Sequence, residues 1–304
     1  RGYVHLVFGK AIKNQSDVEL MRLTTAGNLG IGTSSPDASS LVDISSTSMG
    51  FLPPRMSITE RNAISSPAAG LIIYNTTTSR PNIYNGTIWK TFDGTWENCG
   101  MPITYSGQIY NTVLIGNQCW MRENLNVGTR IDGSIDQTNN STIEKYCYYD
   151  NNTYCDTYGG LYEWNEMMQY VTTEGTQGIC PSGWHIPTDD EWKTLEGTVD
   201  TQYGVGNPEW DNLSNRGFDA GDRLKTNTGW YYSGNGTDVF AFSALPGGYS
   251  TNTFYYHDQS GYWWSSNEVS GPSAFYRKLK YNTDQVYRNT TSKTYGMSVR
   301  CLKN

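Results

Sequence analysis

The sequence predicts an α+β protein with a β-rich N-terminal segment and a larger C-terminal domain. A length of 304 residues suggests about two domains. Aromatic residues reach 13% while charged residues are only 17%, a composition that supports a buried, β-rich structure and argues against disorder. All six cysteines lie at or after Cys99. We therefore place an assembly or shaft segment at residues 1–92 and a second domain at residues 93–304.

The N-terminal segment contains short strands separated by turns. Residues 3–8 are a good strand, but no turn-linked partner lies directly beside them in the sequence. The other elements expected, in order, are a strand–turn–strand unit over 21–33, a strand over 41–44, one or two helical turns over 59–64, and a hairpin formed by 70–77 and 82–90. The Gly-Asn pair at 27–28 supplies the turn of the first unit, because both residue types accept positive φ.

The C-terminal domain is organised around residues 178–196, which read GICPSGWHIPTDDEWKTLE. A strand over 184–186 ends at a bend, and Thr188 and Glu191 then form a capping box that predicts the start of a helix. Trp192, Leu195 and Val199 follow at helical spacing. We also expect a strand over 109–115, a strand over 119–121, a helix over 160–168, a short helix over 220–226, and strands and turns from 241 to the end.

Charge and hydropathy exclude several functional classes. The net charge of −7 argues against nucleic-acid binding, which needs a basic surface, and against an electrostatic membrane anchor. No apolar run approaches the roughly 20 residues that span a bilayer, so we expect no membrane span. The chain begins at Arg1 and not at Met, so we expect that a leader, either removed or not included in this sequence, precedes it.

The cysteines indicate the cellular compartment. Their number is even and no two form a C-x-x-C pair, so neither a zinc finger nor a redox motif is expected. We interpret them as three disulfides formed in an oxidising compartment, which places the protein outside the cell or on its surface. The cysteines are Cys99, Cys119, Cys147, Cys155, Cys180 and Cys301.

Catalysis and cofactors find little support in the sequence. The three histidines are far apart, and the H-E-x-x-H and G-x-S-x-G motifs do not occur. His185 lies in the expected strand, where we predict a hydrogen-bonded structural role. Asp189, Asp190 and Glu191 cluster in a first helical turn, where the helix dipole also stabilises anions. A structural calcium ion at these carboxylates or at the oxygen-rich segment 132–136 stays an open alternative; no other cofactor is expected.

Two dense aromatic stretches are candidates for binding a glycan. Aromatic rings stack on sugar faces when they are exposed, and neighbouring Gly, Ser and Asn leave room for a ligand. The alternative is that alternate rings simply belong to the core, as we expect for Trp263 and Trp264. The candidate residues are Trp230, Tyr231, Tyr232, Tyr255 and Tyr256.

The N-terminal segment is a candidate for self-assembly. It has few large apolar residues, so neighbouring chains could complete its core. An exposed strand is also a template for pairing with another subunit. The residues proposed for subunit contact are Tyr3, Val4, Leu6, Val7 and Phe8. The alternative is a two-domain monomer in which the first strand folds back on its own domain.

Residues 21–91 carry a resemblance to known sequences. The stretches AGNLGIGTSSPDASSLVDISS, GFLPPRM and GLIIYNTTTSRPNIYNGTIWK resemble a segment of surface and fibre-like proteins of Bacteroidetes-type bacteria and of some phage tail fibres. The resemblance implies a shaft or assembly segment and no enzymatic activity.

Residues 99–303 resemble the Fibrobacter succinogenes major paralogous domain. The motifs, in order, are CWMRENLNVGTR, KYCYYDNNTYC, YGGLYEWNEMM, GICPSGWHIPTDDEWKTLE, FSALPGGY, YWWSSNE and MSVRCLK. That family is bacterial and exported, and its function is usually unassigned. Its pattern is similar to the C-type-lectin-like and formylglycine-generating-enzyme folds. The resemblance implies two helices against a small, irregular antiparallel sheet, with long loops on one side.

The resemblance also implies that Cys180 pairs with Cys301 across the domain. Cys147 and Cys155 are close enough to close a local loop, which would leave Cys99 and Cys119 as the last pair. Six cysteines allow fifteen connectivities, so this set is one prediction among them.

The leading hypothesis is an extracellular structural protein, a subunit of a bacterial surface filament or an adhesive fibre. It would form a homopolymer through its N-terminal segment and display the disulfide-bonded domain. The first alternative is a carbohydrate-binding adhesin module. The second is an enzyme of the formylglycine-generating type, which would need a free reactive thiol.

Overall fold

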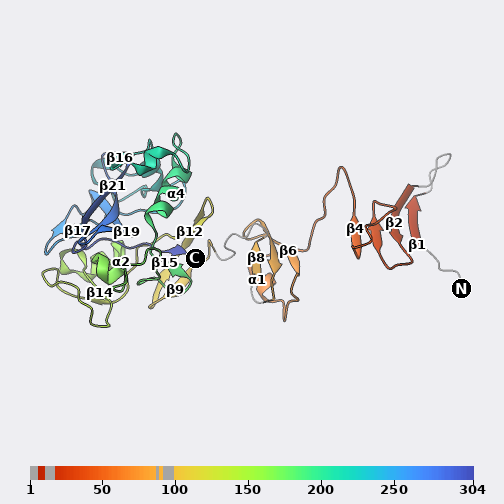
Figure 1. Ribbon diagram of the computed structural model, residues 1–304, viewed down its shortest axis with the longest axis horizontal. Coiled ribbons are helices and arrows are strands. Elements are labelled where there is room, and N and C mark those ends of the chain that lie inside the picture. The colour runs from red at the N-terminus through yellow and green to blue at the C-terminus, as the bar shows by residue number, and fades with distance from the viewer. Residues whose placement is uncertain (1–5, 11–17, 87–88, 92–98) are drawn as a thin grey trace. The chain divides into compact units, whose positions relative to one another are not determined.

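The computed structural model describes residues 6–10, 18–86, 89–91 and 99–304, and describes only the backbone of 6–10 and 18–19 (Figure 1). The chain divides into two compact units, Arg1–Gly94 and Thr95–Asn304. This division lies two residues from the boundary placed by sequence. The described residues form many short strands and five short α-helices, which confirms the α+β class.

The first sheet has the order β1-β2-β3-β4. Its strands are β1 (Leu6–Lys10), β2 (Val18–Leu23), β3 (Leu29–Ile31) and β4 (Val42–Ile44). β1 pairs antiparallel with β2, β2 antiparallel with β3, and β3 parallel with β4. The strand, turn and strand expected over 21–33 are therefore present.

The prediction that the first strand has no partner nearby is wrong. Leu6 lies opposite Leu23 and Lys10 lies opposite Val18, so β1 pairs with the next strand of its own chain. The pairing was unexpected because the second strand was predicted to begin at Met21, whereas β2 begins at Val18 and its first half lies opposite Gly9 and Lys10. Tyr3 and Val4 lie outside the described residues.

The second sheet of the first unit has the order β5-β6-β7-β8. Its elements are β5 (Arg55–Met56), α1 (Ile58–Asn62), β6 (Ile72–Asn75), β7 (Arg80–Tyr84) and β8 (Trp89–Thr91). The hairpin expected here is formed by β6 and β7, but the second strand ends at Tyr84 and a third strand, β8, follows it.

The C-terminal unit contains a small sheet of order β11-β12-β22-β15, which joins strands from near its start to its last strand. These strands are β11 (Thr112–Ile115), β12 (Gln118–Met121), β22 (Leu302–Lys303) and β15 (Trp184–His185). A separate hairpin of β9 (Ile103–Tyr105) and β10 (Gln108–Tyr110) precedes it. The strand expected over 109–115 is therefore two strands, because the chain leaves β10 at Tyr110 and enters a different sheet at Thr112.

The largest sheet has the order β16-β21-β20-β19. It comprises β16 (Ser214–Arg216), β19 (Ser260–Ser270), β20 (Ser273–Lys280) and β21 (Val286–Ser292). Its pairing places Trp263, Arg277 and Arg288 in one cross-strand row. The adjacent row consists of Tyr262, Lys278 and Tyr287. Because successive side chains of a strand point to opposite faces, these two rows lie on opposite faces of the sheet.

Over its described residues, 99–304, the C-terminal unit has four α-helices, more than the two that the family resemblance implies. They are α2 (Asn152–Tyr158), α3 (Trp164–Met167), α4 (Asp189–Val199) and α5 (Ala220–Leu224). The helix expected over 160–168 is shorter because Leu161 and Tyr162 form β-bridges with Tyr146 and Met297. Short strands β13 (Thr129–Arg130), β14 (Glu144–Lys145), β17 (Tyr249–Ser250) and β18 (Phe254–Tyr255) complete the unit, with 3-10 turns at Tyr148–Asp150, Pro208–Asp211 and Tyr231–Ser233.

Helix α4 begins as the sequence predicts. The Thr188 hydroxyl accepts a hydrogen bond from the Glu191 amide, and the Glu191 carboxylate accepts one from the Thr188 amide at 2.8 Å. Trp192, Leu195 and Val199 are buried in a hydrophobic cluster that also contains Trp263. The helix therefore packs on the same face of the large sheet as the row of Trp263.

A buried ion network joins α4 to the large sheet. The Asp189 carboxylate accepts hydrogen bonds from Arg277 Nη1 at 2.7 Å and from Arg288 Nη2 at 2.7 Å. The Glu196 carboxylate accepts a bond from Arg277 Nε at 2.6 Å and another from Arg216. All five side chains are buried. Since buried charges need partners, each charge of this network depends on the others.

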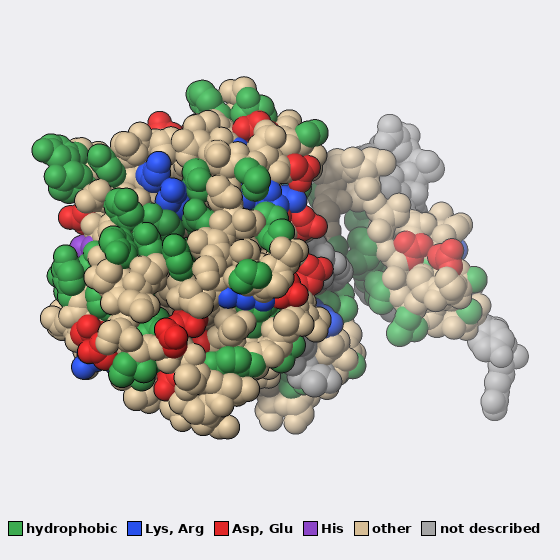
Figure 2. All heavy atoms as spheres, turned by 60° about the vertical axis from the view of Figure 1, so that its left-hand side comes forward, with side chains coloured by type: hydrophobic (Ala, Val, Ile, Leu, Met, Phe, Trp, Pro, Cys, Tyr) green, Lys and Arg blue, Asp and Glu red, His purple; other side chains and the backbone are tan. Residues whose placement is uncertain are grey.

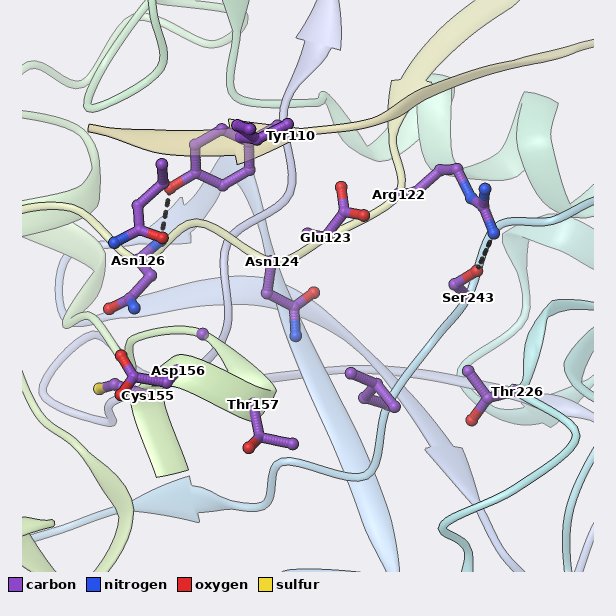
Figure 3. A pocket seen from close by; sticks show the side chains of 14 residues that line it. Tyr110, Arg122, Glu123, Asn124, Asn126, Cys155, Asp156, Thr157, Thr226 and Ser243 are labelled. Atoms are coloured by element: carbon purple, nitrogen blue, oxygen red, sulfur yellow. Dashed lines mark hydrogen bonds between the residues drawn. The ribbon is translucent and has the colours of Figure 1, made fainter. Parts of the chain in front are cut away.

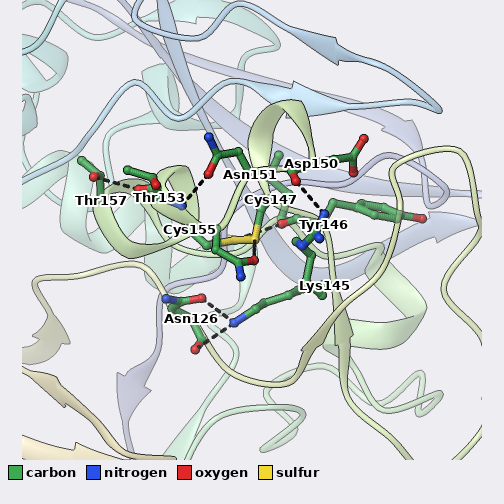
Figure 4. Close-up of a disulfide and its surroundings, with 12 residues drawn as sticks. Asn126, Lys145, Tyr146, Cys147, Asp150, Asn151, Thr153, Cys155 and Thr157 are labelled. Carbon is green, nitrogen blue, oxygen red and sulfur yellow. Dashed lines mark hydrogen bonds between the residues drawn. A yellow bond between two sulfur atoms is a disulfide. The ribbon is translucent and has the colours of Figure 1, made fainter.

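Three disulfides join Cys99 to Cys119, Cys147 to Cys155, and Cys180 to Cys301. These are the pairs expected from the sequence. Figure 4 shows the Cys147–Cys155 bond beside the start of α2, where Asn151 caps the helix by accepting a hydrogen bond from the Thr153 amide at 3.0 Å.

Candidate ligand-binding site

A cavity lined largely by tyrosine lies on the outer face of the large sheet, opposite α4. It measures about 220 Å³. Two residues, Tyr276 and Lys278, come from β20, and Tyr262 comes from the neighbouring β19. We call this cavity the tyrosine basin; its lining residues are Tyr249, Tyr256, Tyr262, Tyr276, Lys278, Thr291, Tyr295 and Met297.

The strand register explains the floor of the basin. Tyr262 lies directly opposite Lys278, so both side chains leave the sheet on the same face. Arg277 and Leu279, the neighbours of Lys278 in β20, are buried on the other face. Tyr262 and Lys278 therefore lie on the face of the sheet that forms the basin. Arg277 and its ion network lie on the opposite face, toward α4.

Segments outside the large sheet supply the wall. Tyr249 stacks on Tyr295 with ring centroids 5.5 Å apart and an interplanar angle of 5°. Tyr255 stacks on the same Tyr249 ring at 5.3 Å, and Tyr256 lies 6.0 Å from it. A bridge between Gly248 and Gly261 holds β17 against β19. The wall is thus a group of nearly parallel rings fixed beside the sheet.

Lys278 carries the only cation among the residues that line the basin. Its Nζ lies 3.7 Å from the ring centroid of Tyr287 and 5.8 Å from that of Tyr262. Burial, and then the charge of the nearby Lys280, lower the pKa of Lys278 to about 8. Lys278 therefore remains charged at neutral pH, held over aromatic rings.

The tyrosine hydroxyls of the floor keep their protons. Burial raises the pKa of Tyr262 and of Tyr276 well above the ordinary value. Protonated phenols donate as well as accept hydrogen bonds, so the basin offers donors to a ligand alongside the ammonium.

Only some of the aromatic residues singled out by sequence are exposed. Tyr231 and Tyr255 are each 40% exposed, Tyr256 is 51% exposed and Tyr232 is 81% exposed. The prediction for Trp230 is wrong, because its ring is only 4% exposed and its Nε1 donates a hydrogen bond to Thr226 Oγ1 at 3.0 Å. Trp230 belongs to the core, and its ring face is not available to a ligand.

The structure separates the two predicted aromatic stretches. Tyr256 lines the basin and Tyr255 stacks against its wall. Tyr231 and Tyr232 are not among the lining residues, and lie in the 3-10 turn at Tyr231–Ser233. The basin thus contains one of the two stretches.

Most of the basin was not predicted from the sequence. Trp263 and Trp264 are core, as expected, but the position of Tyr262 opposite Lys278 in the lining of the basin was not foreseen. The alternation of Tyr276 and Lys278 with buried Arg277 was the signal that could have located the floor. Tyr249 and Tyr295 gave no such signal, because the tertiary fold alone brings them together.

A second, polar cleft of about 230 Å³ lies in the same unit (Figure 3). Several of its polar groups already have partners within the protein. Arg122 donates to Ala241 O at 2.9 Å and to Ser243 Oγ at 3.1 Å, and the Asn126 amide donates to the Tyr110 hydroxyl at 3.0 Å. These side chains hold loops together, so the cleft is a weaker candidate than the basin.

The carboxylates considered for calcium face different partners. Asp189 lies between two guanidinium groups, Glu191 faces His185 at 3.0 Å, and Asp190 pairs with Lys193 at 3.1 Å. In segment 132–136, Asp132 accepts hydrogen bonds from Ser134. Among the described residues, no three His, Cys, Asp or Glu side chains gather in a group that could hold a metal ion.

His185 has the structural role expected. Its Nδ1 lies 2.6 Å from Asn304 Oδ1 and its Nε2 lies 3.0 Å from the Glu191 carboxylate. Burial alone would lower the pKa of His185, but the hydrogen bond and charge of Glu191 outweigh it and raise the pKa. The imidazole thus links the strand β15 to the first turn of α4.

The surface of the C-terminal unit carries mixed charge on the face drawn in Figure 2, where hydrophobic side chains form separate groups among polar ones. In the part of the chain that the structure describes, none of the helices has both the length and the apolar character required to cross a bilayer.

Comparison with known proteins yields two family matches. Residues 30–106 match the phage tail like trimerisation region. Residues 113–303 match the Fibrobacter succinogenes major domain. No curated protein and no solved structure matches the chain. Since the second match covers more than half of the sequence, the chain belongs to the Fibrobacter succinogenes major domain family.

Proposed function

We propose that this protein is the subunit of an extracellular fibre or filament, in which the N-terminal unit joins three chains and the C-terminal domain is displayed. The observation that carries the proposal is the exposure of large apolar side chains on the first unit.

These apolar side chains are concentrated between residues 20 and 52. Their exposed fractions run from 37% to 78%, whereas single scattered apolar residues are the norm on the surface of a monomer. They are Leu20, Leu23, Ile31, Leu41, Val42, Ile44, Met49, Phe51 and Leu52. Most of them lie inside the stretch that matches the trimerisation region, 30–106. A subunit interface would remove them from water.

The interior of the first unit supports the same conclusion. Among its described residues, Ile58 and Ile73 are the only buried large hydrophobic side chains. The other buried groups are polar: Arg61, for example, donates a hydrogen bond to Asn82 Oδ1 at 3.1 Å. Such small apolar cores rarely stabilise a unit alone, and association with further copies is a common remedy.

The first strand offers a second contact. β1 is at the end of the sheet order, so within the described residues its outer edge pairs with no other strand of this chain. We propose that the backbone of Leu6, Val7 and Phe8 adds to a neighbouring subunit at this edge. This contact supplements the apolar interface and does not require β1 to leave β2.

The three disulfides support an extracellular location, because such bonds persist in oxidising compartments. All six cysteines are paired. An enzyme of the formylglycine-generating type would need a reactive thiol, so we do not propose that activity.

The double substitution Leu41→Asp and Phe51→Asp tests the apolar interface. Two charges placed among the exposed apolar side chains should convert the assembled full-length protein into single chains, as measured by light scattering coupled to size-exclusion chromatography. The matched control, Val205→Asp with Leu213→Asp, changes two similarly exposed apolar residues of the C-terminal unit, at 59% and 53%, and should leave the assembly intact. An assembly that tolerates the first pair would refute this interface.

A further inference from the structure

We propose that the tyrosine basin binds an acidic sugar residue, a pyranose that carries a carboxylate. The sugar ring would pack on the tyrosine wall, and the carboxylate would contact Lys278. The inference rests on the geometry of the C-terminal unit and is independent of how the chain assembles.

The size of the basin suits a small ligand. Pockets for drug-sized molecules measure roughly 300–1,000 Å³. The basin, at about 220 Å³, is smaller and its lining includes the half-exposed Tyr256. A single sugar unit at the end or side of a glycan can therefore enter while the rest of the glycan stays in solvent.

The wall has the geometry that sugar stacking needs. The C–H bonds on one side of a pyranose form a flat apolar face that packs against an aromatic ring. Tyr249, Tyr255 and Tyr295 are stacked and hold one another in place, so little side-chain entropy is lost when a ligand arrives. Tyr256, at 51%, is more exposed than Tyr255, at 40%, and is the one of the two that lines the basin.

The cation makes an acidic sugar a better ligand than a neutral one. Among the described residues no carboxylate pairs with Lys278, whose ammonium lies over the Tyr287 ring. A half-buried ammonium with no anionic partner attracts a carboxylate strongly, because the local dielectric constant is low. Lys280 on the same strand adds to the positive potential. The tyrosine hydroxyls can donate further hydrogen bonds to the carboxylate.

The rest of the molecule argues against a larger polyanion as the ligand. The chain has a net charge of −7, which disfavours a nucleic-acid backbone as the ligand. A small inorganic anion has no apolar face, so it would make no use of the aromatic wall. A sugar that carries a carboxylate can use both the tyrosine wall, through its apolar face, and the Lys278 ammonium, through its charge.

Binding of two matched sugars to the full-length protein tests the proposal. Methyl glucuronide and methyl glucoside differ only at C6, which is a carboxylate in the first and a hydroxymethyl group in the second, and both are titrated by calorimetry and saturation-transfer NMR. We expect methyl glucuronide to bind about tenfold more tightly, the effect of one charge-assisted hydrogen bond. Lys278→Met should bring the two affinities together, whereas Lys278→Arg, which keeps the charge, should preserve the preference.

Two further variants separate stacking from charge. Tyr256→Ala should weaken the affinity for both sugars by about two- to tenfold. The control Tyr232→Ala, which replaces an exposed tyrosine outside the basin, should change neither affinity. Thermal unfolding verifies that each variant is folded. The proposal is overturned if the wild type binds neither sugar, if Lys278→Met keeps the preference, or if acetate binds as tightly as methyl glucuronide, which would mean a small-anion site.

Discussion

Asp189 has two structural roles, one local to its helix and one in tertiary packing. By position it is the first residue of α4, where a carboxylate is favoured by the helix dipole. In the structure it does more, because it accepts hydrogen bonds from Arg277 and Arg288 on two strands of the large sheet. The first role is evident from the sequence, but the second is not, since Arg277 and Arg288 lie 88 and 99 residues away in the chain.

Removal of one cation from this network should be severely destabilising. In Arg277→Met, Asp189 and Glu196 lose a buried partner, and we expect a loss of about 3–5 kcal/mol of unfolding free energy. Denaturant unfolding followed by tryptophan fluorescence measures the change. Arg130→Met, which removes an exposed guanidinium, serves as the control and should cost less than about 1 kcal/mol. Equal effects of the two substitutions would contradict the account of the network.

The same network predicts how stability depends on pH. Burial alone would raise the pKa of Asp189, but the hydrogen bonds and charges of Arg288 and Arg277 outweigh it and lower the pKa below its ordinary 3.8. The stabilisation is therefore complete above the unfolded-state pKa and is lost as pH falls through the lower folded-state pKa. Unfolding free energies of the wild type should fall as pH drops below about 4. Asp189→Asn should show a shallower fall over that range; an identical fall would exclude Asp189 as the cause.

Among the elements, the bounds of α4 were the most predictable and those of two other elements were less so. The capping box and helical spacing of residues 188–199 are local signals, and the helix forms where they place it. The strand expected over 109–115 is instead two strands in different sheets, and the helix expected over 160–168 is shorter because Leu161 and Tyr162 form β-bridges with Tyr146 and Met297. The tyrosine basin depends on such distant pairings, which explains why the sequence revealed only Tyr255 and Tyr256.

Helix α4 should depend measurably on its cap. Thr188→Ala removes the hydroxyl that accepts a hydrogen bond from the Glu191 amide, and we expect a loss of about 1 kcal/mol of unfolding free energy. Thr188→Ser keeps the hydroxyl and should retain nearly all of the stability in the same denaturant titration. If alanine and serine at this position behaved alike, the capping interaction would not contribute to stability.

At the scale of the whole molecule, the Cys180–Cys301 bond connects the central segment of the C-terminal unit to its last strand. It closes a separation of 121 residues, whereas Cys147–Cys155 closes one of 8. In the chain-entropy model the longer loop stabilises by about 5 kcal/mol and the shorter by about 2.5 kcal/mol. The family resemblance indicated the long pairing in advance; composition and spacing alone left fifteen connectivities.

Removal of each disulfide should reveal this difference. The double variant Cys180→Ala with Cys301→Ala should lose more unfolding free energy than Cys147→Ala with Cys155→Ala, by about 2 kcal/mol. Differential scanning calorimetry of the two variants at one pH gives the comparison. A greater loss on removal of the short-loop bond would show that native-state contacts near α2, and not loop length, decide the effect.

The two units have different structural requirements. The C-terminal unit has an extensive apolar core and three disulfides, so it has what a displayed domain needs to fold as one chain. The first unit has little apolar interior and many exposed apolar side chains, which we interpret as the surface that joins subunits. In this account one end assembles and the other presents the tyrosine basin.

The number of full-length chains per particle in solution is the most direct test of assembly through the first unit. Native mass spectrometry, supported by light scattering over a range of protein concentrations, counts the chains without labels. The account predicts particles with three times the mass of one chain, or larger assemblies built from such trimers. A mass equal to that of one chain at every concentration would contradict it.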